Sequence, residues 1–319
     1  MTVRLLLLLA LGVAFAGSAS AQYPNRAIKM LPHSPPGSGP DMIARLLAAS
    51  LQEGMGQPVV VENRPGANGN IAGEYVARSP ADGYTLLIAT DAQLTINPHV
   101  YAKLGFDWNK DLLPVASIAT EAFKLVVSND VPARTVAEFI AHARSVKKPL
   151  FYGSAGNGSQ HHLTMELFKE RAGIELVHVP YKGGGPATTQ ALLAGEIQAT
   201  IGGAAVDGQV KAGKLRTLGI TGPTRSPRYP DLPTVGETLP GFEMVAWFAM
   251  FAPSGTPSEA ITRLRGDVAR FLALPEAQAK INASGPEVWI STPEQFAASI
   301  RRDYERNGKL VKALGIRLD

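Results

Sequence analysis

The chain has 319 residues, 45% hydrophobic and 18% charged, a composition typical of a globular protein with enough residues for two α/β lobes. Its formal net charge is +4, and its lysines and arginines form no stripe of the kind that binds nucleic acid, so we exclude that class. The absence of cysteine excludes disulfides and lipidation through an N-terminal cysteine.

The first 21 residues have the three parts of a secretory signal peptide. Arg4 gives the positive n-region, residues 5–16 are apolar, and Ala19-Ser20-Ala21 is a small-residue cleavage site before Gln22. No later apolar run has the length of a membrane span. We therefore expect a soluble exported protein, periplasmic if the source has two membranes.

The first half of the mature chain alternates strands with helices, which favours a parallel, doubly wound sheet. Ligands bind such sheets beyond the carboxyl ends of the strands. A polar turn, Thr90 to Gln93, stands at one of those ends. The predicted strands are 26–30, 59–61 and 84–89, and the predicted helices begin near residues 39 and 71.

The turn at residues 33–41, H-S-P-P-G-S-G-P-D, follows the first strand. Ser38 and Asp41 have the spacing of a capping box, so one interpretation is simply a well-capped helix start. The second interpretation adds that the N–H groups of Gly37, Ser38 and Gly39 face a ligand. Asp41 must then point back into its own cap, because a carboxylate there competes with an incoming anion.

The second half repeats the pattern of strand, polar turn and helix. A strand ending near Tyr152 leads through the turn 153–159 into a helix from about residue 160. Unpaired N–H groups and the positive end of the helix dipole make such a turn an anion site. A second glycine-rich turn at 180–186 places Pro186 at the first position of the next helix. The other predicted elements are strands at 123–128, 175–179, 197–201 and 215–220 and helices at 135–145 and 187–194.

Residues 244–252 are nine apolar residues, too short to span a bilayer and typical of a buried strand. We expect this strand and one near 122–127 to cross between two lobes. Three helices, at 257–274, 275–283 and 293–314, are expected to pack back on the first lobe.

Three kinds of chemistry are disfavoured by the motifs. A catalytic Ser154 would need Gly at position 152, which is Tyr152, and no acid and histidine partner is evident. His161, His162 and Glu166 lack the H-E-x-x-H spacing of a zinc site. The glycine turns lack the spacing of a phosphate loop or a dinucleotide fingerprint. Several N–H-rich turns without a nucleophile or a metal cluster indicate binding without chemistry, with no cofactor and no metal.

Ordered motifs run through almost the whole mature chain. They include P-P-G-S-G-P-D at Pro35, V-V-V-E-N-R-P-G-A-N-G-N at Val59, G-S-A-G-N-G-S-Q-H-H-L at Gly153, and V-P-Y-K-G-G-G-P-A at Val179. In these motifs the chain resembles the extracytoplasmic solute receptors of tripartite tricarboxylate transporters, the Bug or TctC-like proteins.

The resemblance implies an α/β fold, a two-lobe periplasmic binding protein (type II, Venus flytrap) with two crossover strands. We expect lobe 1 to comprise residues 22–122 and 249–319, and lobe 2 residues 123–248. It also implies a monomeric receptor, not an enzyme, that captures a small organic carboxylate such as a dicarboxylate or an aromatic acid. The expected partners are the small and large membrane subunits of the transporter. The alternative is a binding protein that presents the carboxylate to a membrane sensor.

The expected ligand-binding residues come from both lobes. Ser34 and Ser38 stand where relatives usually have an aromatic residue and a glycine, and the stretch from Gly202 to Asp207 also departs from the family pattern, which predicts a roomier or more polar pocket. The full set is Ser34, Gly37, Ser38, Gly39, Thr90, Asp91, Ser154, Asn157, Gly158, Ser159, His162, Tyr181, Gly183, Gly184 and Asp207.

Overall fold

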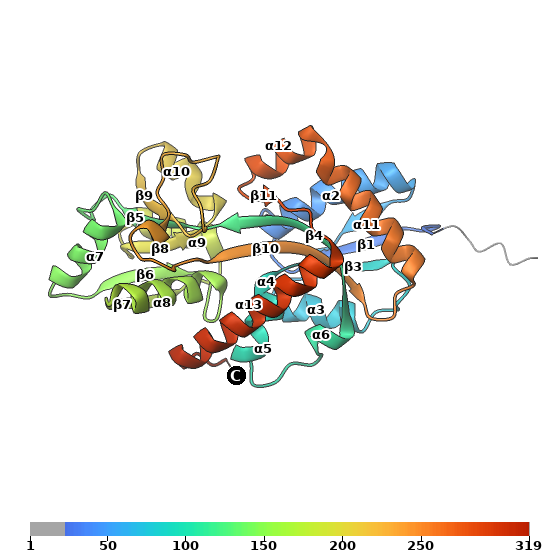
Figure 1. Ribbon diagram of the computed structural model, residues 1–319, viewed down its shortest axis with the longest axis horizontal. Coiled ribbons are helices and arrows are strands. Elements are labelled where there is room, and N and C mark those ends of the chain that lie inside the picture. The colour runs from blue at the N-terminus through green and yellow to red at the C-terminus, as the bar shows by residue number, and fades with distance from the viewer. Residues whose placement is uncertain (1–22, 319) are drawn as a thin grey trace, which may run out of the picture.

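The computed structural model describes residues 23–318, so the predicted signal peptide lies outside the described residues. Two α/β lobes, each built on its own sheet, lie side by side along the long axis of the molecule, as predicted (Figure 1). No described helix has the length and apolar character needed to cross a membrane.

The sheet of the first lobe has six strands. They are β1 (Ile28–Pro32), β2 (Val59–Val61), β3 (Thr85–Thr90), β4 (Leu112–Ala122), β10 (Val245–Pro253) and β11 (Glu287–Val288). Their order is β11-β4-β10-β3-β1-β2. The predicted parallel pairing holds for β1 with β2 and β3, whereas β10 runs antiparallel to β3 and β4. The sheet is therefore mixed, because the returning strand β10 enters it from the opposite end.

Helices cover both faces of this sheet, as the uninterrupted apolar runs of its strands predict. Alternate residues of β1 and β3 belong to two separate cores: Met30 and Ile88 to one, Leu31 and Leu87 to the other. The helices of the lobe are α2 (Gly39–Met55), the 3₁₀ turn η1 (Ala67–Gly69), α3 (Asn70–Ala77), α4 (Asp91–Thr95), α5 (Asn97–Val100), α6 (Trp108–Asp111), α11 (Ser258–Ala273), α12 (Pro275–Ala283) and α13 (Pro293–Leu314).

The sheet of the second lobe has five strands. They are β5 (Lys124–Ser128), β6 (Leu150–Ser154), β7 (Leu176–Pro180), β8 (Ala199–Gly202) and β9 (Leu215–Ile220). Their order is β7-β6-β8-β5-β9, with β6 parallel to β7 and β8 and β5 antiparallel to β8 and β9. Its helices are α7 (Val136–Ser145), α8 (Gln160–Ala172), α9 (Gly184–Leu193) and α10 (Asp207–Lys211), with 3₁₀ turns η2 (Ala204–Val206) and η3 (Val235–Glu237).

Two chain segments cross between the lobes, as predicted. The first runs from β4 through Phe123 into β5, and the second enters β10 through Met244. Thr221 joins both: its Oγ accepts from the Phe123 N–H (2.9 Å) and donates to the Met244 carbonyl (2.6 Å), and its own carbonyl accepts from the Met244 N–H. β10 begins at Val245, so the boundary expected at 248/249 falls inside a strand. We propose that the second lobe comprises residues 123–244.

The long strand β4 was missed by the sequence analysis. Pro114 interrupts its apolar pattern, and proline is usually excluded from an inner strand because it donates no hydrogen bond. The structure accommodates this proline at an irregularity, since the register between β10 and β4 shifts between Met250 and Phe251, and Phe251 lies opposite Pro114.

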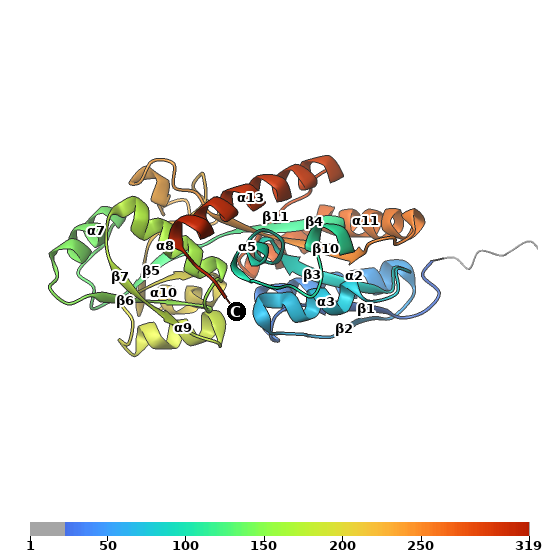
Figure 2. The ribbon, with the colours of Figure 1, turned by 90° about the horizontal axis from the view of Figure 1, so that it is seen from below.

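Helix α13 extends from the first lobe onto the second. Its last turns, with Leu310 and Val311, share a hydrophobic cluster with Ile96, between α4 and α5, and with Leu163 of α8. Figures 1 and 2 show α13 running along one side of the molecule, and in Figure 2 α9 and α3, one in each lobe, lie on the opposite side. The two lobes are thus packed together on the α13 side.

Candidate ligand-binding cleft

The first-lobe turn, residues 33–41, is braced from inside. Its Gly37, with a φ of +80°, donates its N–H to Asp41 Oδ2 (2.8 Å), and the Ser38 N–H is donated to the Pro35 carbonyl (3.3 Å). The Ser38 hydroxyl contacts Ser34 Oγ and the Pro35 carbonyl and makes no cap bond. The predicted capping box is therefore wrong, because the side chains of Ser38 and Asp41 instead make hydrogen bonds to other groups of the turn. Of the three amides expected to face a ligand, only that of Gly39 has no partner among the described residues.

Asp41 points back into the turn, as predicted. Its buried carboxylate accepts from Gly37, from Arg45 Nε (3.1 Å) and from Asn63 Nδ2 (2.8 Å). Burial alone would raise the pKa of Asp41, but the hydrogen bonds from Arg45, Gly37 and Asn63 outweigh it and hold the pKa below its usual value. Asn63 also donates to the Ser34 carbonyl (3.0 Å). The turn is thus held by an ionised carboxylate.

The loop at 66–70 lies beside this turn and was missed as part of the site. A Cβ on Gly69 would lie 3.0 Å from His33 Nδ1, which shows how closely the two segments approach. Asn68 has a φ of +49°, a conformation that asparagine tolerates better than most residues. Its carbonyl accepts from Gln93 Nε2 (2.9 Å) and Asn97 Nδ2 (3.0 Å). The only sequence signal was the position of Asn68 in a family motif.

Thr90 ends β3 and Asp91 begins α4, and the two residues have different surroundings. The N–H and the hydroxyl of Thr90 are both donated to Gln93 Oε1 (2.8 and 2.9 Å). Asp91 is fully buried, and its Oδ1 accepts from the backbone N–H of Trp247 (3.4 Å). Its carboxyl is therefore directed into the protein, toward β10 and α13, away from the surface of the turn.

The second-lobe turn, residues 153–159, is also braced from inside. Gly158 donates its N–H to His162 Nδ1 (3.1 Å), and Ser159 donates its N–H to the Gly156 carbonyl (3.2 Å). Ser159 Oγ accepts from the His162 N–H, as expected for the N-cap of α8. The predicted row of free amides at Gly158 and Ser159 is therefore occupied within the turn. Asn157, at its tip, is exposed.

Ser154 has a histidine partner that the sequence did not reveal. Its Oγ lies 2.6 Å from His178 Nε2, on the neighbouring strand β7, where β6 and β7 pair in parallel. Ser154 is completely buried, its hydroxyl also contacts the Gly156 carbonyl, and no described carboxylate hydrogen-bonds to His178. A serine nucleophile needs access to substrate and an oriented base, so this pair has the geometry of a brace for the turn.

The histidines belong to a stack of rings beneath the turn. His162 and His178 lie 3.9 Å apart between ring centroids at 9°, and Tyr152 stacks on His178 at 4.9 Å. Tyr152 donates to Glu166, which pairs with Lys169 at 2.8 Å. Burial lowers the pKa of His178 to about 4 and also lowers that of His162. The neutral ring of His162 is what allows its Nδ1 to accept from Gly158.

The helix that follows the glycine-rich turn at 180–186, α9, begins earlier than predicted. The helix starts at Gly184, so Pro186 occupies its third position and not its first. The Tyr181 N–H is donated to the Ser154 carbonyl (2.9 Å), which ties this turn to the preceding one. The Tyr181 hydroxyl contacts Glu196 (3.2 Å), and the Gly184 N–H is donated to the Tyr181 carbonyl. Gly183, at the N-cap, precedes the helix start directly.

The carboxylate of Asp207 forms ion pairs and a hydrogen bond with side chains of its own lobe. It accepts from Lys124 Nζ (2.8 Å), from the Tyr229 hydroxyl (2.7 Å) and, at 3.4 Å, from Arg228. Because Lys124 is only 3% exposed, Asp207 is required as its counter-ion. Glu121, which the sequence analysis did not single out, lies nearby: a Cβ on Gly203 would lie 2.7 Å from its Oε1. Burial raises the pKa of Glu121 to about 7.

Contacts across the lobes bring the loop at 66–70 of the first lobe against the second-lobe turn. Asn68 Nδ2 of the first lobe donates to the Asn157 carbonyl of the second (3.1 Å). A Cβ on Gly158 would lie 2.9 Å from Leu318 and 3.5 Å from Asn68 Nδ2. In the first-lobe turn, a Cβ on Gly39 would lie 3.4 Å from the ring of Phe248 in β10. The turn after β1, the loop at 66–70 and the turn after β6 are thus neighbours in space.

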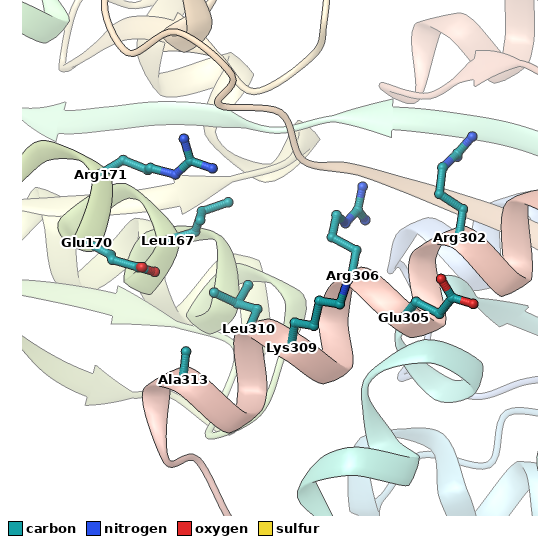
Figure 3. Close-up of a pocket in the computed structure, with 9 residues that line it drawn as sticks. All are labelled: Leu167, Glu170, Arg171, Arg302, Glu305, Arg306, Lys309, Leu310 and Ala313. Atoms are coloured by element: carbon teal, nitrogen blue, oxygen red, sulfur yellow. The ribbon is translucent and has the colours of Figure 1, made fainter.

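A separate groove of about 440 Å³ lies between α8 and α13. Figure 3 shows charged side chains reaching into it from both helices. None of the predicted site residues lines this groove. The residues that line the groove are Leu167, Glu170, Arg171, Arg302, Glu305, Arg306, Lys309, Leu310 and Ala313.

No group of three or more described side chains has an arrangement that could hold a metal ion.

Known proteins resemble this chain over nearly its full length. The protein BugT of Bordetella pertussis is 34% identical over 322 residues, covering 99% of this chain and 98% of BugT. A structure of an R. palustris protein with adipate is 38% identical, with a TM-score of 0.87, and covers 92% of this chain and 99% of that one. MatC from Rhodopseudomonas palustris with bound malate is 29% identical, with a TM-score of 0.79, over 91% of this chain and 100% of MatC.

These structures confirm the two-lobe periplasmic binding fold. The family model described as the tripartite tricarboxylate transporter family receptor, TctC, matches residues 43–316, from α2 to the end of α13 and just beyond. The match therefore includes both crossover segments and the second-lobe turn. The chain belongs to the TctC family of tripartite tricarboxylate transporter receptors.

Proposed function

We propose that this receptor binds a small organic carboxylate between the first-lobe and second-lobe turns and delivers it to the small and large membrane subunits of a tripartite transporter. The hydrogen bond from Asn68 to Asn157 carries the proposal, because it joins a loop beside the first-lobe turn to the tip of the second-lobe turn. The adipate and malate of the two related structures, both dicarboxylates, support a carboxylate ligand. We further propose that residues 1–21 direct the chain to the periplasm and are removed there, and that the receptor is a monomer.

The bracing of the turns limits which groups can hold the ligand. Four expected amides, those of Gly37, Ser38, Gly158 and Ser159, are used inside the turns. The proposed donors are instead the Gly39 amide and the groups at the tip of the second-lobe turn around Asn157. A hydrogen bond to a charged group contributes about 1.5–3 kcal/mol, so three or four donors suffice for about micromolar affinity after ordering costs.

The glycine-rich turn at 180–186 gives the second lobe a further surface that could contact the ligand. Gly183 and Gly184 lie at the start of α9, which is joined to the Ser154 turn through Tyr181. Ser34 and Ser38 present small hydroxyl side chains in the first-lobe turn. We propose that these positions bound the far end of the ligand and leave room for a chain of several carbons.

A calorimetric titration of the mature protein tests the proposal. Adipate, malate, benzoate and glutamate would be added separately, and each would be recovered afterwards for mass analysis. We expect at least one acid to bind with a stoichiometry of one and to be recovered unchanged, with about 2.7 kcal/mol of added stability at a hundredfold excess over Kd. No binding by any of the four, or a chemically altered ligand, would contradict it.

A further inference from the structure

The segment that follows α13 returns to α5 of the first lobe (Figure 1). Gly315 ends the helix in the left-handed conformation, with a φ of +62°. Leu318 then pairs in parallel with Tyr101: its N–H is donated to the Val100 carbonyl, and its own carbonyl accepts from the Ala102 N–H (3.3 Å). Two backbone hydrogen bonds therefore fix the position of Leu318 at the end of α5.

Helix α5 also holds the other contact of the first lobe to the second-lobe turn. Asn97, its first residue, is fully buried and donates Nδ2 to the Asn68 carbonyl (3.0 Å). Asn68 in turn donates Nδ2 to the Asn157 carbonyl of the second lobe (3.1 Å). The two ends of one short helix thus position Asn68 and Leu318.

Leu318 contacts the residue of the second-lobe turn that follows Asn157. A Cβ on Gly158 would lie 2.9 Å from Leu318 Cδ1 and 3.4 Å from Val100 Cγ2. On its other side, Gly158 donates its N–H to His162 Nδ1 (3.1 Å). Position 158 is therefore enclosed from two sides, and the absence of a side chain allows Leu318 to approach the backbone closely.

This contact belongs to a hydrophobic cluster that both lobes share. Leu318 and Val100 lie in it with Leu163 of α8 and with Met244 of the second crossover segment. Apolar contact favours whichever arrangement of the lobes buries it. Leu318 makes its hydrogen bonds through the backbone, so shortening its side chain removes the contact with the turn and leaves those bonds in place.

We propose that Leu318 is a positioning residue for ligand capture: together with Asn68 it holds the tip of the second-lobe turn at one place against the first lobe. Asn68 binds the Asn157 carbonyl, and Leu318 packs against the Gly158 backbone. The proposed donors of the second lobe lie around Asn157, so a displaced tip binds a ligand carboxylate less well. The inference rests on the proposed function for its effect on affinity, whereas its effect on the lobes is measured without ligand.

Calorimetry and stopped-flow kinetics with the tightest-binding of adipate, malate, benzoate and glutamate test the effect on affinity. Leu318→Ala should bind this acid about threefold to tenfold more weakly, mainly through faster dissociation. Leu314→Ala is the matched control, because Leu314 is a partly buried member of the same cluster on α13. It should be destabilised similarly and bind within about twofold of wild type. Leu318→Met nearly conserves volume and should restore the affinity.

A double-mutant cycle with Gly158→Ala tests the contact itself without ligand. In wild type, Gly158→Ala should lower the denaturation midpoint through strain at a φ of +70° and through crowding against Leu318. In the Leu318→Ala background the strain remains and the crowding is relieved, so the further loss should be smaller. Equal losses in the two backgrounds would overturn the inference.

Spin labels on the two lobes decide the outcome if no acid binds wild type, which is the result that would contradict the proposed function. The sequence has no cysteine, so Glu53→Cys on α2 and Lys147→Cys after α7, both at exposed positions, can be labelled selectively. The distribution of distances between the labels should be broader in Leu318→Ala than in wild type and unchanged in Leu314→Ala.

Without a binding acid, an unbroadened distribution in Leu318→Ala would overturn the inference. With one, an affinity and a dissociation rate equal to those of Leu314→Ala would do so. Should Leu318→Ala fail to fold, Leu318→Val should show the same changes at a smaller size, and their absence would overturn the inference in the same way.

Discussion

The first-lobe turn and the second-lobe turn, which we propose to hold the ligand between them, are built on opposite principles. The first-lobe turn is held by an ionised carboxylate, Asp41, which gathers donors from Gly37, Arg45 and Asn63. The second-lobe turn is held by two neutral histidines, His162 and His178, which contact Gly158 and Ser154. In both, amides that seem free in the sequence are used for bracing. The feature that the two turns share is therefore a rigid backbone, more than a large number of free amides.

The largest effect is expected from crowding the second-lobe turn. Gly158→Val places a side chain in the left-handed region, at a φ of +70°, with its Cβ 2.9 Å from Leu318. We expect a loss of about 1–2 kcal/mol for the backbone and a further 1–3 kcal/mol for the crowding, with at least about tenfold weaker binding. Gly195→Val is the matched control, since its φ is +75° and its Cβ meets open space.

Chemical denaturation and calorimetry of the two glycine variants measure the difference. Gly195→Val should lose only the backbone part of the stability and keep its ligand affinity. Equal affinities in the two variants would show that Gly158 does not line the cleft.

Removing the carboxylate of the first-lobe turn should have the next largest effect. Asp41→Ala leaves the Gly37 N–H and the Asn63 amide without an acceptor, at a cost of about 2–4 kcal/mol in unfolding free energy. Binding should weaken with it, because the turn loses its brace. Asp267→Ala removes another buried carboxylate, which pairs with Arg263 on α11, far from the cleft. That control should be destabilised and yet bind normally, and the comparison fails if Asp41→Ala also binds normally.

Acid should loosen the second-lobe turn before the first. The pKa of His178 is lowered to about 4, so its contribution to stability is present above the ordinary histidine pKa and is lost as the pH falls from about 6.5 toward 4. The pKa of Asp41 is also lowered, so its contribution is lost only at still lower pH. Melting temperatures of the wild type should therefore decline over the histidine range.

Two variants separate this histidine effect from general acid sensitivity. His178→Phe keeps a ring in the stack and cannot take a proton, so its melting temperature should decline less steeply over the same range. His142→Phe on α7, outside the stack, should keep the wild-type slope. A steep decline that persists in His178→Phe would refute the neutral-histidine brace.

The smallest effect is expected at the contact between the two walls. Asn68→Gly keeps the positive φ and removes the donor to the Asn157 carbonyl. An exposed hydrogen bond contributes about 0.5–1.5 kcal/mol, so the ligand should bind about twofold to tenfold more weakly. Asn129→Gly removes a similar exposed bond, to the Gly213 carbonyl, within the second lobe only. Calorimetry should find that the control binds normally, and equal losses in both variants would contradict the cross-cleft role of Asn68.

The sequence predicted most of the elements because their apolar patterns are local. β9 was placed at its observed bounds, and α13 likewise, since strands and amphipathic helices buried on defined faces show their periodicity directly. β4 was missed because Pro114 breaks its pattern, and the register shift that accommodates it lies on a partner strand more than a hundred residues away. The antiparallel course of β10 also depends on long-range topology.

The site was predicted at the level of turns and not at the level of atoms. The glycine-rich turns after β1 and β6 were found where the sequence predicted them, but which of their amides are free depends on side chains elsewhere in the chain. His178 reaches Ser154 only because β6 and β7 pair in register, and Asp91 is turned inward by Trp247. Asn68 carried no signal beyond its position in a family motif. Such pairings arise from tertiary contacts, which local patterns do not encode.

The crystal structure of the mature protein with its tightest-binding acid would test the central claim most directly. The account predicts an unmodified carboxylate in the cleft, within about 2.7–3.2 Å of a donor from the first-lobe turn near Gly39 and of one from the second-lobe turn near Asn157. A carboxylate held by one lobe alone, or seated in the groove between α8 and α13, would contradict it.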